Sequence, residues 1–572
     1  MDAPNIAPQR KTYDAIVVGS GITGGWAAKE FTEKGLDTLV LERGRNVTHG
    51  DDYITEHKPS WEMDFQGQGN KQEFEEHYPR QSMAGPFNAY NKHFFVKDSK
   101  YPYTFDEKEP FLWVRGYHLG GRSITWGRQC YRWSDLDFTA NARDGVGIDW
   151  PIRYDDVAPW YDYVEEFAGI SGREEGLPHL PDGQFQPPME MNAGEKKIKA
   201  GLENAYQDRM MTIGRSAVLT EPKPEQGRAA CHYCGPCARG CTVGAYFSSL
   251  SSTLPAARET GNMTLECDSI VHSVKYDSET GRASGVRVID RKTKETREYE
   301  GRVVFLCASA LGSTKILLNS TSSRFPNGLA NSSGMLGRGI MDHHFKVGAS
   351  GTIPGLEDRY YYGDRPNGIY IPRFRNLSGQ DGDVDFLRGY GYQGAAYREG
   401  WTRALGEEGF GASLKHQLRD PGQWRMYLGA FGEILPDDDN YVELDDEQND
   451  EWGIPVLRMH VSLGENEKAM REDMKAQAAE MLEAAGATEV STYEQRYWPG
   501  EGIHEMGGAR MGRDPDSSVL NGHNQAHDVP NLFVTDGACM TSAGWQNPSI
   551  TYMALTARAV DYAVKEMERD NL

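Results

Sequence analysis

Long apolar runs are absent from this chain of 572 residues. No uninterrupted apolar stretch reaches about 18 residues, the length that a helix needs to cross a bilayer, so the sequence predicts no transmembrane span. The first residues, MDAPNIAPQRK, also lack the apolar core of a secretory signal. We therefore expect a protein that is cytoplasmic, already processed, or exported together with a partner that carries the signal.

Positive charge and cysteine are scarce as well. The chain has 61 Lys and Arg against 84 Asp and Glu, and the net charge of −23 argues against nucleic acid or an anionic membrane as a partner. Eight cysteines in 572 residues are too few for a scaffold held together by disulfides. Apolar residues make up 38% of the chain, which at this length is enough to form a core.

A dinucleotide-binding pattern lies near the start of the chain. The apolar residues 15–18 predict a buried parallel strand, and a glycine-rich loop, GSGITG, follows at 19–24. Residues 22–34 have helical spacing, and residues 37–41 predict a second strand that ends at Glu42. This order of strand, loop, helix and strand predicts a Rossmann-like unit.

The three glycines and the acid have separate roles in such a unit. Gly19, Gly21 and Gly24 let the backbone turn tightly and approach a pyrophosphate. The N-terminus of the helix attracts that anion through its unpaired N–H groups and its dipole. Glu42 ends the second strand, where a carboxylate can accept hydrogen bonds from a ribose 2′-OH. The pattern therefore predicts FAD or NAD rather than NADP.

Segments typical of a nucleotide-binding domain recur at the start, in the middle and at the end of the chain. Residues 345–460 are rich in Tyr, Trp, Gly and Arg and predict a β-sheet cap that holds substrate. We expect an α/β (α+β) protein whose two domains are interleaved. The other expected elements are helices at 155–170, 194–206, 308–319, 467–485 and 549–566, a strand at 531–535, and strands within 263–307 that include TREYE and VVFLC as separate ones.

Four blocks of sequence, spread over nearly the whole chain, carry a specific pattern. They are GSGITG with LERG, GGRSITWG at 120–127, VVFLCASALGSTKILLNS at 303–320, and HEMGG at 504–508 with NLFVTDGACMTSAGWQNPSITYMALTARAV at 531–560. Together they resemble the glucose–methanol–choline (GMC) family of FAD-dependent alcohol oxidoreductases. The resemblance implies a Rossmann-like FAD-binding domain at 1–50, 111–135, 210–344 and 500–572. It also implies a lid and substrate-binding cap, containing a β-sheet, at 51–110, 136–209 and 345–499.

The resemblance places FAD against residues from several of these blocks. Pro548 begins the last helix, whose N-terminal partial positive charge would stabilise the reduced flavin. Pyranose oxidases are similar at the second block, but they carry a histidine that is covalently linked to FAD one residue before the tryptophan. This chain has Thr125 there, so we expect non-covalent FAD. The expected FAD contacts, besides the three glycines and Glu42, are Arg43, Gly120, Gly121, Ser123, Trp126, Val271, Asp536, Gly537, Asn547 and Pro548.

The resemblance also implies that His504 is the catalytic base. Oxidation of an alcohol needs a base for the hydroxyl proton while the hydride goes to the flavin, and the ordinary pKa of histidine suits that task. Other family members have a second histidine where this chain has Asn547. Asparagine takes no proton at neutral pH, but it can orient the alcohol oxygen through hydrogen bonds. We interpret the pair His343-His344, which lies outside the four blocks, as structural.

Four cysteines form a second motif, at Cys231, Cys234, Cys237 and Cys241. Their C-x2-C-x2-C-x3-C spacing matches a ferredoxin-type iron–sulfur cluster, although Thr242 follows where that motif has proline. A structural zinc site and plain buried cysteines are the alternatives. Bacterial membrane-associated sugar dehydrogenases of the family are similar in placing a cluster-binding cysteine segment between the same blocks. The resemblance implies electron transfer to a cytochrome, a small subunit that carries an export signal, and a periplasmic location.

We expect a dehydrogenase that oxidises a secondary hydroxyl of a sugar or glycoside. The C3 position follows from overall likeness to glucoside 3-dehydrogenases. Trp545 and Gln546 directly precede Asn547, and family geometry implies that they lie near the bound sugar. The alternatives are an oxygen-using enzyme similar to pyranose oxidase or C-glycoside oxidase, and a gluconate- or sorbitol-type dehydrogenase. A non-catalytic flavin or iron–sulfur electron carrier would lack the pair of His504 and Asn547.

Overall fold

A computed structural model describes residues 11–377, 384–400, 403, 409–419 and 421–572. One of its two large sheets contains parallel strands in the order β7-β2-β1-β10. Beyond β10, the N-terminal half of this strand pairs with antiparallel β9, and β8 pairs with β9. The C-terminal half of β10 pairs with parallel β19. The strands are β1 (Thr12–Val18), β2 (Thr38–Leu41), β7 (Met263–Glu266), β8 (Ser269–Asp277), β9 (Arg282–Asp290), β10 (Thr296–Leu306) and β19 (Leu532–Val534).

The parallel part of this sheet is buried on both faces, which explains its continuous apolar sequence. Ala15 and Val17 of β1 belong to one apolar cluster, together with Phe31 of α1 (Ile22–Glu33). Ile16 and Val18, whose side chains point the opposite way, belong to another. Strand β1 is therefore the central strand, buried on both faces, that the sequence predicts. The glycine loop follows directly after its last residue.

Strand β10 differs from the prediction, because TREYE and VVFLC form one strand rather than two. Gly301 lies between the two halves and does not end the strand. A Cβ at Gly301 would lie 2.7 Å from Cγ1 of Ile16, so the glycine allows β10 to pack closely beside β1. The continuous strand carries the antiparallel β9 on its first half and β19 on its second.

The second large sheet is antiparallel, with the strand order β18-β12-β15-β14-β13-β6 and with β11 also paired to β15. Helix α10 (Glu465–Ala484) packs on it, and Met470, Met474 and Met481 of the helix share an apolar cluster with Val347 and Met426 of the sheet. The strands are β6 (Thr212–Ile213), β11 (His343–His344), β12 (Val347–Ile353), β13 (Ile369–Ile371), β14 (Tyr390–Arg398), β15 (Trp424–Glu433) and β18 (Thr488–Glu494).

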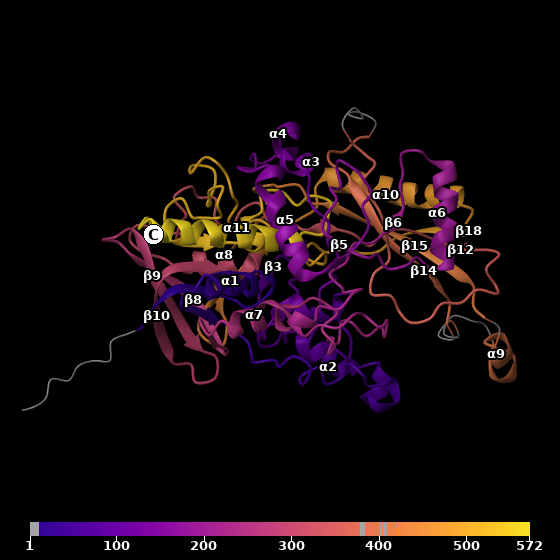
Figure 1. The fold of residues 1–572 in the computed structure, drawn as a ribbon, viewed down its shortest axis with the longest axis horizontal. Helices are drawn as coiled ribbons and strands as arrows, with labels where there is room; N and C mark the ends of the chain where they lie inside the picture. The colour runs from indigo at the N-terminus through magenta and orange to yellow at the C-terminus, as the bar shows by residue number, and fades with distance from the viewer. Residues whose placement is uncertain (1–10, 378–383, 401–402, 404–408, 420) are drawn as a thin grey trace, which may run out of the picture.

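The two sheets lie toward opposite ends of the long axis of the molecule. In Figure 1, β8, β9 and β10 are on the left, whereas β12, β14 and β15 are on the right. The segments that build each sheet alternate along the chain, as the interleaved pattern predicts. The expected domain boundaries themselves stay a prediction.

Most of the long helices were predicted to within two or three residues. They are α5 (Tyr154–Ala168), α6 (Ala193–Ala205), α8 (Ala310–Leu318), α10 and α11 (Ser549–Glu568). The remaining elements are α2 (Lys71–His77), α3 (Asp135–Phe138), α4 (Ala140–Asp144), α7 (Thr253–Glu259), α9 (Gly411–Gln417), β3 (Thr104–Phe105), β4 (Ile170–Ser171), β5 (Phe185–Gln186), β16 (Tyr441–Asn449), β17 (Pro455–His460) and several short 3-10 helices.

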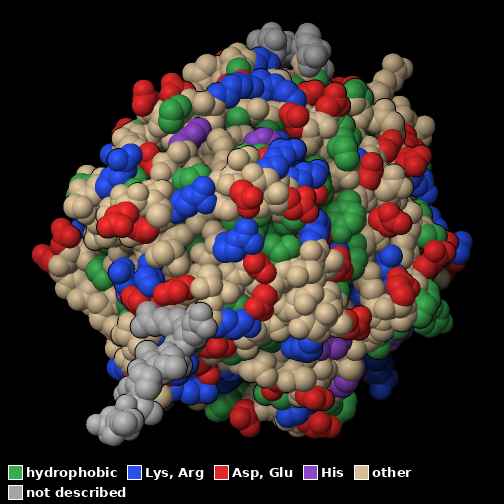
Figure 2. Space-filling model, turned by 60° about the vertical axis from the view of Figure 1, so that its left-hand side comes forward, with side chains coloured by type: hydrophobic (Ala, Val, Ile, Leu, Met, Phe, Trp, Pro, Cys, Tyr) green, Lys and Arg blue, Asp and Glu red, His purple; other side chains and the backbone are tan. Residues whose placement is uncertain are grey.

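The helices and the surface agree with the composition of the sequence. Within the described ranges, no helix combines the length and the apolar character that a membrane crossing requires. Acidic and basic side chains are interspersed over the face drawn in Figure 2. The net charge of −23 is therefore not gathered into a single acidic patch on that face.

Candidate functional site: a dinucleotide cradle beside a histidine–asparagine pair

Each glycine of the first motif is required for a different structural reason. Gly19 has φ +102°, and a side chain there would collide with the carbonyl oxygen of Cys307. A Cβ at Gly24 would collide with the carbonyl oxygen of Gly19, so this glycine lets α1 pack tightly on the loop. Gly21 caps the N-terminus of α1, and no atom of the described residues lies within 4 Å of a Cβ built there. Gly21 therefore borders open space at the helix N-terminus, where a pyrophosphate can approach the backbone.

Glu42 lies at the end of β2 beside this loop. Its buried carboxylate accepts hydrogen bonds from Oγ of Ser20 at 2.5 Å and from the backbone N–H of Gly44 at 2.8 Å. Burial raises its pKa above the ordinary value. A carboxylate has about four acceptor positions, so the two hydrogen bonds leave capacity for ribose hydroxyls. The next residue, Arg43, stacks its guanidinium over the ring of Tyr117, 3.9 Å from the ring centroid.

The second glycine-rich block lies directly against the first. The backbone N–H of Gly120 donates to Oγ of Ser20 at 3.0 Å, and Oγ of Ser123 donates to the carbonyl oxygen of Gly120 at 2.6 Å. A Cβ at Gly121 would be 3.6 Å from Cα of Gly21. Two glycine loops that are a hundred residues apart thus border the same space, as the resemblance implies.

Two further residues expected at the cofactor are held by the protein. The indole N–H of Trp126, which follows Thr125, donates to the carbonyl oxygen of Phe247 at 2.9 Å. Val271 is buried in β8, the edge strand of the antiparallel part of the sheet, and pairs with Val288. Their contacts with FAD stay predictions.

The fourth block brings the N-terminus of α11 to the same region. Asp536 follows β19 and accepts hydrogen bonds from Oγ of Ser313 at 2.5 Å and from the N–H of Ala538 at 3.0 Å. Burial raises the pKa of Asp536 to about 6. Gly537 lies so close to the carbonyl oxygen of Glu505 that no side chain fits there. Pro548 is the N-cap of α11, so the helix begins at Ser549, two residues after Asn547.

Taken together, these segments fit a bound dinucleotide. Two glycine loops, a helix N-terminus with an open approach and an acid at the end of the neighbouring strand are the parts that hold a pyrophosphate and a ribose. The residues that would hold FAD are Gly19, Gly21, Gly24, Glu42, Gly120, Gly121 and Ser123, with Asp536, Gly537 and Pro548 at the α11 end.

His504 lies in a chain of hydrogen bonds that sequence reasoning did not foresee. Its Nδ1 is 2.8 Å from Nδ1 of His343, and Nε2 of His343 is 2.9 Å from the carbonyl oxygen of Gly544. The two imidazole rings are nearly perpendicular, with centroids 4.9 Å apart. His343 was interpreted as structural, whereas the structure places it directly behind the expected base.

Asn547 lies on the other side of the His504 ring. Its Nδ2 is 3.4 Å from Nε2 of His504, and its Oδ1 accepts a hydrogen bond from Nε2 of Gln393 at 2.7 Å. Gln393 is on β14, so the antiparallel sheet reaches the expected catalytic pair. The structure therefore brings His504 and Asn547 together and adds Gln393, which no sequence motif marks.

Burial keeps both imidazoles neutral. Desolvation lowers the pKa of His504 well below its usual range, and the neighbouring His343 and Arg122 act in the same direction. Desolvation also lowers the pKa of His343 to about 4. A neutral imidazole has one nitrogen without hydrogen, which can accept a proton. His504 is therefore in the protonation state that a base requires at neutral pH.

Two buried acids lie beside His504. Oδ1 of Asp342 accepts the backbone N–H of His504 at 2.9 Å, and Oδ2 accepts the N–H of Gly502 at 2.9 Å. Burial, and next the nearby charge of Glu505, raises the pKa of Asp342 to about 7. Glu505 pairs with Arg122 of the second glycine block at 2.8 Å. These contacts fix the His504 backbone and tie the fourth block to the second.

The two residues expected near the sugar are both buried. The ring of Trp545 stacks on Tyr370 of β13, with centroids 5.7 Å apart and an angle of 12° between the rings. The amide nitrogen of Gln546 donates to Oδ2 of Asp137 at 2.9 Å. Gln546 is therefore engaged within the protein, and contact of either residue with substrate stays a prediction.

The cysteine segment does not form the metal site that its spacing predicts. Cys231, Cys234, Cys237 and Cys241 are all free thiols, and Cys234 is exposed. Over the described ranges, no group of three or more His, Cys, Asp or Glu side chains is arranged to hold a metal ion. Desolvation raises the pKa of the Cys231 thiol to about 11. The expectation of an iron–sulfur cluster is thus not supported, and neither is the zinc alternative.

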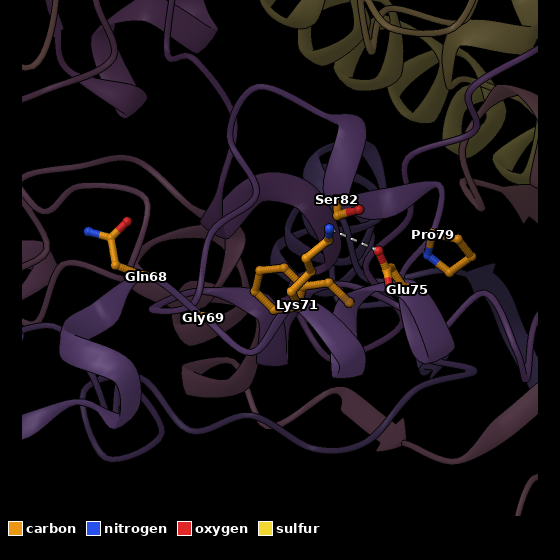
Figure 3. Close-up of a pocket in the computed structure, with 7 residues that line it drawn as sticks. Gln68, Gly69, Lys71, Glu75, Pro79 and Ser82 are labelled. Carbon is orange, nitrogen blue, oxygen red and sulfur yellow. Dashed lines mark ion pairs between the residues drawn. The ribbon is translucent and has the colours of Figure 1, made fainter. Parts of the chain in front are cut away.

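A surface pocket elsewhere does not belong to this site. It lies beside α2 and contains a Lys71–Glu75 ion pair of 3.6 Å, which Figure 3 shows as a dashed line. None of its lining residues belongs to the four blocks. They are Gln68, Gly69, Lys71, Phe74, Glu75, Pro79 and Ser82.

The fold and the site define a flavin-type dinucleotide-binding oxidoreductase. Two family models of GMC oxidoreductases match the chain, the N-terminal one over residues 13–345 and the C-terminal one over residues 436–556. The chain belongs to the GMC oxidoreductase family, as the four sequence blocks indicated. It is therefore an FAD-dependent oxidoreductase that acts on CH–OH groups.

Named relatives cover almost the whole chain. A 2-methyl-1,2-propanediol dehydrogenase of Mycolicibacterium austroafricanum is 28% identical, over 96% of this chain and 94% of its own length. The fructose dehydrogenase large subunit of Gluconobacter japonicus is 26% identical, over 97% and 98%. The gluconate 2-dehydrogenase flavoprotein of Pantoea cypripedii is 23% identical, over 96% and 93%.

Solved structures support the fold alone. A pyridoxine 4-oxidase from Mesorbium loti aligns with a TM-score of 0.59 and 15% identity, over 96% of this chain and 99% of that one. A formate oxidase variant from Aspergillus oryzae aligns with a TM-score of 0.62 and 13% identity, over 99% and 100%.

Proposed function

We propose that this protein is a dehydrogenase that oxidises a secondary hydroxyl of a sugar or glycoside to a ketone, at C3 of glucosides. The observation that carries the proposal is the neutral His504, whose Nε2 faces the amide of Asn547 beside a dinucleotide cradle. The pair offers a proton acceptor and a hydrogen-bond donor to one hydroxyl group.

The protein's part in the reaction is to hold the alcohol and to take its proton. FAD, when bound, would supply the acceptor for the hydride that leaves the carbinol carbon. His504 receives the hydroxyl proton on Nε2. Asn547 donates from Nδ2 to the substrate oxygen, because its Oδ1 is already engaged by Gln393. The His504 ring is only partly exposed to solvent, and desolvation favours its neutral form before the proton arrives.

The activities for which relatives are named support a polyhydroxylated substrate. They include a fructose dehydrogenase and a gluconate 2-dehydrogenase over nearly the full chain. A C-glycoside 3-oxidase of Microbacterium trichothecenolyticum is 25% identical over 54% of this chain, which supports the C3 position. A paromamine 6′-oxidase of Streptomyces fradiae, 25% identical over 96% of this chain, keeps an oxygen-using enzyme as the second candidate.

The remaining parts of the proposal concern the cofactor linkage and the electron acceptor. Thr125 cannot form the covalent link to FAD that a histidine forms, so we infer that acid releases the flavin. We propose an external acceptor such as a cytochrome, and export to the periplasm with a small partner subunit, by likeness to relatives that are named large subunit and flavoprotein. No electron path through the four cysteines is part of the proposal.

Reduction of the flavin by substrate under anaerobic conditions tests the proposal. Glucose and methyl β-glucoside should both bleach the flavin and give a 3-keto product. The anomeric hydroxyl is blocked in methyl glucoside, so bleaching by glucose alone would show oxidation at C1 and contradict the C3 assignment. In air, peroxide formed in proportion to turnover, without dye reduction, would replace the dehydrogenase by an oxidase.

A further inference from the structure

We propose that His343 is a positioning residue that fixes the tautomer of His504. By this account, His343 holds the hydrogen of His504 on Nδ1 and leaves Nε2 as the bare nitrogen that faces Asn547 and the substrate. The inference rests on the proposed role of His504 as a base. It adds a residue that lies outside the four sequence blocks and whose ring bonds to His504 and to the carbonyl oxygen of Gly544.

The carbonyl oxygen of Gly544 determines which nitrogen of His343 carries hydrogen. A carbonyl oxygen only accepts hydrogen bonds, so Nε2 of His343, 2.9 Å away, must carry a hydrogen. The ring is buried, with 1% of the residue exposed, and burial disfavours its charged form. A neutral imidazole with hydrogen on Nε2 has a lone pair on Nδ1. Nδ1 of His343 is therefore an acceptor.

The acceptor on His343 in turn determines which nitrogen of His504 carries hydrogen. Nδ1 of His504 is 2.8 Å from the Nδ1 acceptor of His343, so it must be the donor. In the neutral ring, Nε2 of His504 then has no hydrogen. The position of Asn547 agrees with this assignment, because its Oδ1 accepts from Gln393 and its amide hydrogens are left to face Nε2 of His504.

Strand β15 and its neighbours hold both His343 and Gly544 in place. His343 belongs to β11, which pairs with Glu433 and Gly432 of β15, and its own carbonyl oxygen accepts a hydrogen bond from the Tyr497 hydroxyl at 2.9 Å. The N–H of Gly544 donates to Oε2 of Glu433 at 3.1 Å. The carbonyl of Gly544 and the ring of His343 are thus held from the same strand, β15.

Proton transfer changes the protonation of only one nitrogen, Nε2 of His504. The hydroxyl proton moves to Nε2 of His504, while the hydride leaves the carbon for FAD, the oxidant of the proposed reaction. The hydrogen on Nδ1 stays in place and continues to bond to His343, now from a positively charged donor. Such charge-assisted hydrogen bonds are stronger than neutral ones, so His343 also stabilises the product form of the base.

Three holoenzyme variants test this role. His343→Leu removes the acceptor, His343→Asn restores an acceptor close to the position of Nδ1, and His344→Leu is the control. His344 is the next residue of the same strand, is fully buried, and points to the opposite face, close to Met470 and Met474. All three are compared by FAD content and by the rate of flavin reduction at saturating substrate, measured anaerobically.

We expect His343→Leu to reduce this rate about 10–100-fold, by analogy with the loss when a partner that orients a metal-ligating histidine is removed. His343→Asn should recover most of the loss, and His344→Leu should keep the wild-type rate. The loss in His343→Leu should persist as the pH is raised from 6 to 9. The ratio of the two tautomers of a neutral imidazole does not depend on pH, so added base cannot restore the correct one.

Three outcomes would overturn the tautomer role. They are a wild-type rate in His343→Leu with full FAD content, an equal loss in His344→Leu, and full recovery of His343→Leu at high pH. The last would mean that His343 acts on the pKa of His504 instead. His504→Ala, measured in parallel, separates this inference from the proposed function. If His504→Ala keeps the wild-type rate, His504 is not the base. If only His504→Ala is slow, the base stands and the role of His343 fails.

Discussion

At the scale of single residues, the site depends on side chains that control one another's hydrogen bonds. Asn547 is held on one side by Gln393 at 2.7 Å and faces His504 on the other at 3.4 Å. An amide can rotate and exchange its donor and acceptor ends, and the hydrogen bond from Gln393 favours the orientation in which Asn547 donates toward His504 and the substrate. Gln393 is therefore expected to contribute to orientation of the alcohol without taking part in proton transfer.

Replacing Gln393 by Leu tests this contribution. The Oδ1 atom of Asn547 loses its partner and the amide can rotate, so kcat/KM for the sugar should fall about 10-fold, the scale of one lost hydrogen bond at a partly buried acceptor. Tyr397→Phe is the control, because Tyr397 is on the same strand but 40% exposed. Steady-state kinetics with matched FAD content provide the measurement. An unchanged kcat/KM in Gln393→Leu would show that Asn547 is oriented by other groups.

The same scale explains what the sequence could and could not reveal about the site. His504 and Asn547 could be selected from the sequence because each lies in a continuous motif. His343 and Gln393 could not, because pairings between distant strands, β11 with β15 and β14 with β15, bring them to this pair. Period and spacing along the chain carry no record of such pairings. The Cys231–Cys241 spacing misled in the opposite way, since a local match does not guarantee that the side chains meet.

At the scale of elements, the first strand, loop and helix were predicted closely, because each glycine has a local steric reason. Gly24 permits contact between α1 and the loop, whereas Gly21 faces open space. Long, periodic elements such as α10 and α11 were also predicted, while β10 was divided in two because Gly301 resembles a break. In that case, the close approach to Ile16 decides the structure, and it depends on a strand that is remote in sequence.

Substitutions of two glycines of the first loop should therefore have different effects, one on FAD binding and one on stability. Gly21→Val should fold like the wild type but lose FAD, because its side chain enters the space open to the pyrophosphate. Gly24→Ala should destabilise the FAD-free protein by roughly 1–3 kcal/mol, the usual cost of overpacking. Urea unfolding of FAD-free proteins and flavin content after purification distinguish the two effects. Gly85→Ala is the control, since no atom of the described residues lies within 4 Å of the added Cβ. Equal destabilisation by both loop variants would refute the division of roles.

At the scale of the whole molecule, the site lies where segments of both large sheets meet. The parallel sheet provides the glycine loop and, after β19, the start of α11. The antiparallel sheet provides His343 on β11 and Gln393 on β14. This arrangement follows from the interleaved chain, in which neither unit is completed before the other begins. The cysteine segment is separate from the His504–Asn547 pair in sequence, and it bonds elsewhere, for example from the N–H of Thr242 to Glu56. Among the described residues, it is not arranged to hold a metal.

The electron path of the whole molecule should therefore not require these cysteines. Protein purified without oxygen should contain FAD but no stoichiometric iron or acid-labile sulfide. Cys237→Ser should retain dye-linked turnover, because among the described residues the thiols are not arranged around a common metal position. Iron and sulfide assays, together with the visible spectrum, provide the measurement. Three or four iron atoms per chain, lost in Cys237→Ser, would contradict this prediction and restore the cluster that the spacing suggested.

The central claim is that His504 takes the hydroxyl proton of the substrate. Anaerobic rapid mixing with saturating glucose measures flavin reduction in one turnover, without any contribution from the electron acceptor. His504→Ala should bind FAD normally and reduce it about 10²–10⁴-fold more slowly than the wild type, the range expected when a general base is removed. A His504→Ala protein with full FAD content and a wild-type rate of flavin reduction would contradict the account.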